Sequence, residues 1–282
     1  MLMSKVKEFF GLFTGRDDVD WKRAIALQHC PYTEKKCVKV RKSSPDISIG
    51  ICTVDYSTYN VVMICPHRFL ERRQIFIDCV HLLTLHEPGN ELHLLSEVSV
   101  PGGSVDYFLV SVFKGKVVDF IGIELQTLDT TGSLWSERAA LIDSKGFAVS
   151  EADKSYKTFG MNWKMSAKTI LVQMHHKIET FEHLGKHLVL VVQDCFCDYM
   201  AREFSFSHFR KARQGDSVHI HSYSLDEVGG NALRLRLRDR ISTDANGISL
   251  CLGLQAEAKM ELDKIVEYLK TRISESTLMK IV

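Results

Sequence analysis

The pattern of apolar and polar positions predicts a chain that mixes helices with strands. Apolar residues recur at helical spacing over 68–85 and 162–184, which predicts two long helices. Runs rich in β-branched residues predict strands at 105–113, 116–127 and 187–193. The last run, HLVLVVQ, is apolar almost throughout and is typical of a central strand that is buried on both faces.

Further predicted elements set the order of the chain. Shorter helices are predicted at 4–13, 20–28, 91–96, 134–142, 199–209 and 256–272, and further strands at 48–54, 59–64, 218–225 and 233–240. A cysteine-rich stretch near the N-terminus has little helical periodicity, whereas the rest alternates helices and strands. We therefore expect an α/β protein in two parts, an N-terminal segment with a small cysteine module at 1–80 and a larger mixed α/β domain at 81–282.

The composition is that of an ordinary globular protein. The chain has 282 residues, 45 % of them hydrophobic, and its 36 basic residues against 35 acidic ones give a net charge of +1. Its apolar runs fall far short of the roughly 20 residues that span a membrane, and the N-terminus lacks a typical signal-peptide cleavage site. We therefore expect a cytoplasmic protein without a membrane partner, in which eight cysteines stay reduced.

The segment VDYFLVSVFKGKVVDFIGIELQ, residues 105–126, predicts a β-hairpin. If its turn is centred on Gly115, the numbers of antiparallel partners sum to 230, and Asp106 faces Glu124. Facing residues lie roughly 4.5–5.5 Å apart at their Cα atoms, and two carboxylates that close are costly to ionise without a cation between them.

Gln126 adds an amide to these two carboxylates. It projects to the same face as Glu124, because side chains alternate along a strand, and oxygen ligands of this kind suit Mg²⁺. Gln173 and Lys177, four residues apart on the predicted long helix, are also able to face this site. The alternative is that Asp106 and Glu124 are solvated on an exposed sheet face, which the apolar run around Glu124 disfavours.

These residues resemble a known family. The order of an aspartate (Asp106), a hairpin and a Glu-x-Gln motif is similar to the core of the PD-(D/E)xK nuclease superfamily. More specifically, the segment GIELQTLDTTGS at 122–133 resembles the catalytic strand and turn of the NotI-type restriction endonucleases. That family has Gln where most of the superfamily has Lys, and Gln126 matches it. A glutamate upstream of the aspartate joins the active site there, and Glu91 lies at the matching distance before Asp106.

The resemblance extends over about 30–193, with Val105 where the superfamily motif often has proline. It implies a PD-(D/E)xK core with a mixed central sheet flanked by helices, and a type II restriction endonuclease of the bacterial cytoplasm. Such an enzyme uses Mg²⁺ to cleave double-stranded DNA at a palindromic, GC-rich site, leaves 5′-phosphates and acts as a homodimer.

The same resemblance assigns roles within the site. Asp106 and Glu124 would hold Mg²⁺, Glu91 would support a second metal ion or a water, and Gln126 would orient the attacking water. Two alternatives stay open: a repair or recombination nuclease of the same superfamily that cuts by DNA structure, and a DNA-binding protein with four cysteines that does not cleave.

Four cysteines fall within 36 residues of the N-terminal part: Cys30, Cys37, Cys52 and Cys65. Four thiolates on a loop-rich module are able to bind a tetrahedral cation, but the spacing matches no common zinc finger, so four unrelated thiols are the alternative. The NotI-type enzymes carry a four-cysteine site at this place, also with Cys-Pro at the first and last ligand. The resemblance thus implies a structural Fe or Zn ion, and S₄ coordination accepts either metal.

Positive charge gathers in the same part of the chain. Residues 21–75 hold ten Lys and Arg against four Asp and Glu, a net charge of +6. The residues expected to contact DNA are Lys35, Lys36, Lys39, Arg41 and Lys42 in this part, together with Arg234 and Arg236, which share one face of the predicted strand 233–240 with Arg238. The alternatives are a solvated basic face and an edge strand protected by charge.

Overall fold

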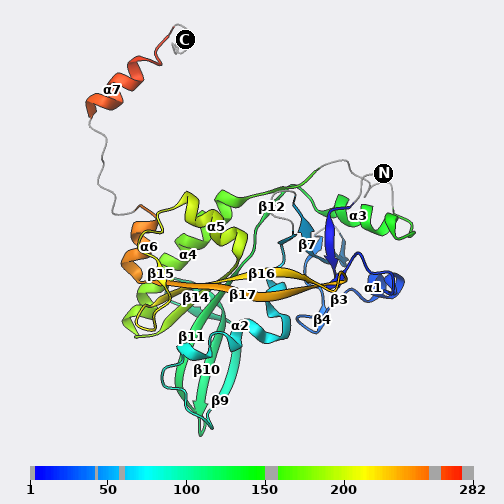
Figure 1. Cartoon of the computed structure of the whole chain (residues 1–282), viewed down its shortest axis with the longest axis horizontal. Helices are drawn as coiled ribbons and strands as arrows, with labels where there is room; N and C mark the ends of the chain where they lie inside the picture. The colour runs from blue at the N-terminus through cyan, green and yellow to red at the C-terminus, as the bar shows by residue number, and fades with distance from the viewer. Residues whose placement is uncertain (1–3, 42–43, 57–60, 150–157, 254–261, 275–282) are drawn as a thin grey trace.

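A mixed sheet of seven strands is the largest element of the fold (Figure 1). Its order is β15-β17-β16-β14-β11-β10-β9. Strand β14 pairs in parallel with β11 and β16, and the other neighbours are antiparallel, which confirms the expected mixed sheet. The strands are β9 (Glu91–Val100), β10 (Gly103–Phe113), β11 (Lys116–Gln126), β14 (His187–Gln193), β15 (Arg210–Lys211), β16 (Val218–Val228) and β17 (Ala232–Thr243). The computed structural model describes residues 4–41, 44–56, 61–149, 158–253 and 262–274.

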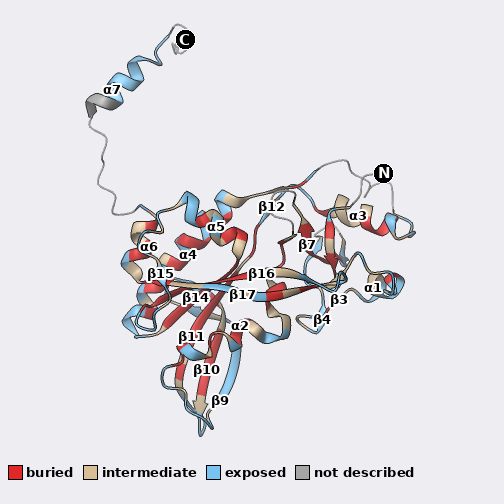
Figure 2. Cartoon of the chain, viewed as in Figure 1, coloured by how far each residue is buried: buried red, intermediate tan, exposed pale blue. Residues whose placement is uncertain are grey.

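Helices cover both faces of this sheet. The first face packs against α4 (Trp163–His183), α5 (Asp194–Glu203) and α6 (Ala245–Cys251). The second face packs against the 3₁₀ helix η1 (Pro66–Arg73), the short helix α2 (Gln74–Ile77) and the 3₁₀ helix η2 (Val80–Leu82). Because strand side chains alternate, the odd-numbered residues of β11 join the second face and its even-numbered residues point toward α4. Figure 2 shows the buried strands at the centre of the sheet.

The N-terminal part forms a second, smaller sheet. Its antiparallel order is β2-β1-β7-β8, and α1 (Trp21–Leu27) and α3 (Trp135–Ser144) lie beside it (Figure 1). The strands of this part are β1 (Val6–Phe9), β2 (Leu12–Phe13), β7 (Ile51–Asp55) and β8 (Val61–Met63), with the short pairs β3 (His29–Cys30) and β4 (Lys35–Lys36), and β5 (Val40–Arg41) and β6 (Ser44–Ser48). A further short pair, β12 (Thr130–Thr131) and β13 (Gly160–Met161), links the loops that flank α3. Both parts contribute to shared hydrophobic clusters, and the predicted division at residue 80 stays a prediction.

Several predicted helices are confirmed. Helix α1 begins after Asp20, whose carboxylate accepts the N–H of Arg23 at 2.9 Å, as an N-cap does. Helix α4 differs from the predicted 162–184 by one residue at each end, and Gly185 follows it with a left-handed φ of +61°. The helix predicted at 199–209 is only partly right, because α5 begins five residues earlier and ends at Glu203. Helix α7 (Leu262–Lys270) is the described part of the helix expected at 256–272 and stands apart in Figure 1.

Three predicted helices are wrong. Residues 4–13 form the β1–β2 hairpin, because Phe10 and Gly11 both adopt positive φ in a tight turn. Residues 91–96 belong to β9, which pairs with β10 along its length. The helix expected at 68–85 is broken into η1, α2 and η2, because Arg72 and Arg73 both adopt left-handed φ.

Candidate functional site

The hairpin of β10 and β11 closes with a two-residue loop and a bulge. Lys114 and Gly115 form the loop, and both have positive φ, as a tight hairpin turn requires. Val118 is left out of the pairing a few residues later, which makes it the extra residue of a β-bulge.

The bulge sets the register that the carboxylates need. Beyond it the numbers of paired residues sum to 230, ending with Tyr107 opposite Ile123. Continued by one residue on each strand, this register puts Asp106 opposite Glu124. The predicted sum of 230 is therefore confirmed as far as Tyr107 and Ile123.

Glu124 is buried and holds a cation from α4. The residue is 4 % exposed, and its Oε1 lies 2.5 Å from Nζ of Lys177, a residue that is also 4 % exposed. Burial raises the pKa of Glu124 to about 7; the hydrogen bond from Lys177 opposes this shift and the carboxylate of Asp106 adds to it. Gln173, the other helix residue expected to face the site, is exposed.

Asp106 is half-buried and is held by the backbone of β11. Its Oδ2 accepts the N–H of Leu125 at 2.8 Å. Burial raises the pKa of Asp106, the hydrogen bond from Leu125 and the charge of Lys177 oppose the rise, and Glu97 adds to it. Among the described residues, the hydrogen bonds to this pair use one oxygen of each carboxylate, which leaves Oδ1 of Asp106 and Oε2 of Glu124 available to a ligand.

Glu97 lies next to Asp106, on β9. It stands between Ser96 and Val98, whose partners on β10 flank Asp106 on either side, and its φ is +54°. Glu97 was not among the residues predicted for the site. A sequence feature that indicates its position is Pro101-Gly102, which is typical of a tight turn. A turn there makes 91–100 a strand antiparallel to β10 and places residue 97 opposite residue 106.

The hypothesis that Glu91 joins Asp106 needs correction. Glu91 is exposed, pairs with Val112 and contacts His93 at 3.2 Å. Along β10 it is six residues from Asp106, or roughly 20 Å at about 3.3 Å per residue. Glu91 is far from Asp106 because 91–96 forms a strand and not a helix. The residue of β9 that lies beside Asp106 is therefore the one opposite it in the strand pairing, which is Glu97 and not Glu91.

Gln126 ends β11 on the same side as Glu124. It is half-buried, and its Nε2 donates to the carbonyl of Thr127 at 2.6 Å. That bond fixes the amide so that its carbonyl oxygen is available at the end of the strand.

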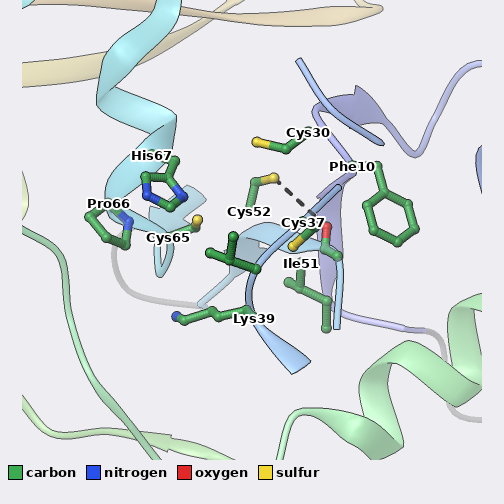
Figure 3. Close-up of a pocket in the computed structure, with 11 residues that line it drawn as sticks. Phe10, Cys30, Cys37, Lys39, Ile51, Cys52, Cys65, Pro66 and His67 are labelled. Carbon is green, nitrogen blue, oxygen red and sulfur yellow. Dashed lines mark hydrogen bonds between the residues drawn. The ribbon is translucent and has the colours of Figure 1, made fainter. Parts of the chain in front are cut away.

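The four predicted cysteines line one pocket of about 220 Å³. Cys30 ends β3, Cys37 follows β4, Cys52 lies on β7 and Cys65 precedes η1. Their sulfur atoms turn toward a common space in Figure 3. Burial and the neighbouring cysteines raise the pKa of Cys52, which makes its thiol neutral in this pocket.

A formed metal centre is absent from the described part of the chain. No three His, Cys, Asp or Glu side chains described come together in a group able to hold a metal ion. At the cysteines, the thiol of Cys52 donates to the carbonyl of Gly50 at 3.7 Å instead (Figure 3). The structure thus does not support the expected Fe or Zn ion, although it brings the four expected residues to one pocket.

His67 lines the cysteine pocket and also interacts electrostatically with Asp106. Its pKa is lowered by burial and by Lys39, while Asp106 raises it. An open groove of about 1020 Å³ runs past the same histidine and includes Glu97, Lys35 and the exposed pair Arg72 and Arg73. The groove therefore borders the cysteine module and Glu97, whereas Asp106, Glu124 and Gln126 do not line it.

The basic residues of the N-terminal part are mostly exposed. Lys35, Lys36 and Lys39 are exposed; Lys36 donates to the carbonyl of Asp46 and Lys39 to that of Ile64. The side chain of Arg41 and the whole of Lys42 lie outside the described residues.

The arginines of β17 have acidic partners. Arg234 contacts Glu71 at 3.0 Å and Arg236 contacts Asp226 at 3.2 Å. Arg238 is the extra residue of a bulge in β17, so it leaves the alternation that the sequence suggested. The first part of β17 lies beyond the short strand β15, and its backbone there is bound by side chains: Arg68 donates to the carbonyl of Leu233, and Glu71 accepts the N–H of Leu235.

A carboxylate pair with an amide beside it, at the end of a central strand of a mixed α/β sheet, is typical of metal-dependent phosphodiester hydrolases. A family model described as restriction endonuclease NotI matches residues 16–216, which is well over half of the chain. The chain belongs to this family, and it is a site-specific deoxyribonuclease that acts on DNA. No curated protein and no solved structure matches it. Within the described residues, no helix has the length and apolarity needed to cross a membrane.

Proposed function

We propose that the protein is a Mg²⁺-dependent type II restriction endonuclease that cuts double-stranded DNA at a palindromic, GC-rich site and leaves 5′-phosphates. One observation carries the proposal: Asp106 and Glu124 face each other, and each keeps one carboxylate oxygen available. These hard oxygen donors fit Mg²⁺, which binds through one or two carboxylates and keeps several waters.

The residues of the site have separate roles in this proposal. Asp106 and Glu124 hold Mg²⁺, which when bound lowers the pKa of a water and offsets the charge that develops on the phosphate. Gln126 orients the attacking water through its carbonyl oxygen, because an amide has no basic group with which to take the proton. Glu97, rather than Glu91, supports a second ion or a water beside Asp106.

The groove that passes Glu97 and His67 is the proposed path of DNA. Lys35 and the pair Arg72 and Arg73 line it, and their charge suits the phosphate backbone. Lys36 and Lys39 extend the same basic surface. Arg234 and Arg236 are also proposed to contact DNA, by exchanging their acidic partners for phosphate groups.

The cysteine pocket is the proposed site of a structural Fe or Zn ion. Four soft sulfur donors at one pocket suit either metal, and the charge of a metal ion that displaces the thiol protons would offset the cost of burying the thiolates. Metal analysis of the purified protein tests this. One equivalent of iron or zinc that is lost in Cys52→Ser supports the site, and neither metal in the wild-type protein removes it.

A palindromic target also implies a two-fold symmetric enzyme, so the protein is proposed to be a homodimer of the bacterial cytoplasm. Sedimentation at micromolar concentration with and without DNA tests the dimer. A monomer under both conditions contradicts it.

Cleavage of a large sequenced DNA, followed by sequencing of the fragment ends, tests the activity. Discrete fragments that require Mg²⁺ are expected; smeared products or junction-specific nicks favour the structure-specific nuclease, and DNA binding without cleavage favours the non-catalytic alternative.

Variants of the site then test the residue roles. Asp106→Asn and Glu124→Ala are expected to abolish cleavage and keep DNA binding, and normal cutting by either variant refutes the assignment. Glu97→Gln is expected to slow cleavage, whereas the matched change Glu91→Gln on the same strand leaves the rate unchanged.

A further inference from the structure

A buried ammonium group completes the carboxylate pair. Lys177 lies on α4, 53 residues after Glu124, and its Nζ is 2.5 Å from Oε1 of that residue. Both side chains are about as buried as the apolar core around them. Lysine is almost never buried unless it is paired, so this position is maintained by the contact with Glu124.

The chain also fixes the stem of Lys177. The turn between β9 and β10 lies against α4, where Thr180 donates to the carbonyl of Pro101 at 3.4 Å. A Cβ atom at Gly102 would lie 2.1 Å from the backbone oxygen of His176, and one at Gly103 would lie 3.2 Å from Cε of Lys177. The two glycines therefore let this turn close over the lysine.

No other side chain of β11 supplies positive charge here. Gln126 is neutral and donates to a backbone carbonyl, while Asp106, Glu124 and Glu97 gather three carboxyl groups. Opposite charges this close in a buried site attract each other strongly, so a fixed cation beside the carboxyl groups has a large effect.

We propose that Lys177 is the positioning residue of the active site: its ammonium holds Oε1 of Glu124 and so directs Oε2 toward Asp106 and the metal ion. This inference rests on the proposed nuclease function. Lys177 acts through Glu124, and it offsets the charge of the acidic cluster while the metal ion is absent.

The experiment compares full-length variants. Lys177→Met keeps the apolar stem and removes the charge, Lys177→Arg keeps the charge, and Lys168→Met is the matched control because Lys168 is exposed on the same helix. The double variant Lys177→Met with Gln126→Lys returns an ammonium to the site from β11. The measurements are thermal unfolding midpoint, Mg²⁺ affinity by titration calorimetry without DNA, and single-turnover DNA cleavage.

Lys177→Met is expected to cleave roughly 10²–10³-fold more slowly, as when another electrostatic contact is removed from an active site. It is also expected to bind Mg²⁺ about tenfold more tightly, because repulsion between the ammonium and the ion is lost. A merely structural role would weaken both properties together. Lys177→Arg and the double variant are expected to regain part of the cleavage rate, and Lys168→Met to match the wild type.

Cleavage by Lys177→Met at the wild-type rate overturns the proposal. If that variant does not fold, Lys177→Gln decides, because it keeps a hydrogen-bond donor and removes the charge, and cleavage by Lys177→Gln at the wild-type rate also overturns the proposal. If the wild type itself does not cleave DNA, the nuclease function fails, but the Mg²⁺ titration still tests Lys177: unchanged affinity in Lys177→Met refutes its role near the metal ion.

Discussion

Acidification to pH 5 should destabilise the protein through two buried histidines of β16. His219 and His221 are 1 % and 0 % exposed and lie beneath η2, on the face of the sheet opposite Glu124. His219 donates from Nε2 to the carbonyl of Asp216, and Nδ1 of His221 lies 3.5 Å from Sγ of Cys79. Nδ1 of His219 and Nε2 of His221 have no hydrogen-bond partner among the described residues.

Burial lowers the pKa of both rings. It is lowered to about 4 for His219, with His187 adding to the effect, and to about 3 for His221, with Arg240 adding to it. Both rings are therefore neutral in the folded protein at pH 5, whereas in the unfolded chain they take up protons below their ordinary pKa of 6.5. The stability that they contribute is fully present above pH 6.5 and is lost as the pH falls toward the folded values.

The size of the effect follows from linkage. One pH unit is worth about 1.4 kcal/mol for each proton, and pH 5 lies about 1.5 units below the unfolded pKa. Each histidine thus loses about 2 kcal/mol between pH 8 and pH 5, and the pair about 4 kcal/mol. For a protein of this size, this corresponds to a fall of roughly 10 °C in unfolding midpoint.

Urea unfolding at pH 8 and pH 5 measures the effect in the wild type and in the double variant His219→Gln with His221→Asn. These changes keep a polar nitrogen near the Nε2 and Nδ1 positions and remove the titration. The double variant is needed as a reference because Glu124 changes the pH dependence in the opposite sense. Its pKa is raised to about 7, so its protonation stabilises the folded protein as the pH falls below that value. His208→Asn is the control, because His208 is exposed.

The free energy of unfolding should fall by about 4 kcal/mol more in the wild type than in the double variant, and His208→Asn should follow the wild type. Parallel pH dependence in the wild type and the double variant would refute the reasoning. It would mean that the two rings are protonated in the folded protein, with partners or water that offset their burial.

Two further predictions concern the scaffold. Gly102→Ala should lower the free energy of unfolding by about 1–3 kcal/mol more than Gly89→Ala, since both glycines have positive φ but only the first would meet backbone atoms; equal losses in urea would contradict this. Glu8→Ala should cost about 1–3 kcal/mol because it removes the more buried of the two carboxylates that pair with Arg68 and leaves Glu71 as its ionic partner, whereas Asp18→Ala, at an exposed pair, should leave the unfolding midpoint unchanged.

The sequence was most informative where structure is local. The apolar run of β14, the cap of α1 and the long helix α4 follow from patterns within a few residues, and each was predicted nearly to its ends. Such local patterns give the wrong element where a tight turn determines whether the segment forms a strand or a helix. At 4–13 and 91–96 the apolar spacing suits a helix, but a two-residue turn nearby makes each segment a strand.

The register of the acidic hairpin was predicted correctly for a different reason from the one assumed. The turn lies between Lys114 and Gly115, so partners near it sum to 229, and Asp106 would then face Ile123. The bulge at Val118 adds one residue and restores the sum of 230 at the site. A bulge depends on the packing of the whole sheet, and the sequence carried no sign of this one.

Most ion partners of the buried carboxylates were not predicted, because they come from distant segments; only Lys177 was expected to face the acidic site. Glu8 and Arg68 are 60 residues apart, Asp119 and Lys186 are 67 apart, and Glu124 and Lys177 are 53 apart. Local spacing does not encode such pairs, and only the packing of helices on the sheet creates them.

Asp106 differs from these carboxylates in a way that bears on function. Among the described residues it forms no ion pair, and a backbone N–H holds it in place. A carboxylate that already has a cation is stabilised by the fold, whereas one that is buried, facing a second carboxylate and bound only to an amide still gains from a cation. The place of Asp106 beside a paired Glu124 is therefore the physical reason to expect a divalent ion at this point of the sheet and at no other carboxylate of β11.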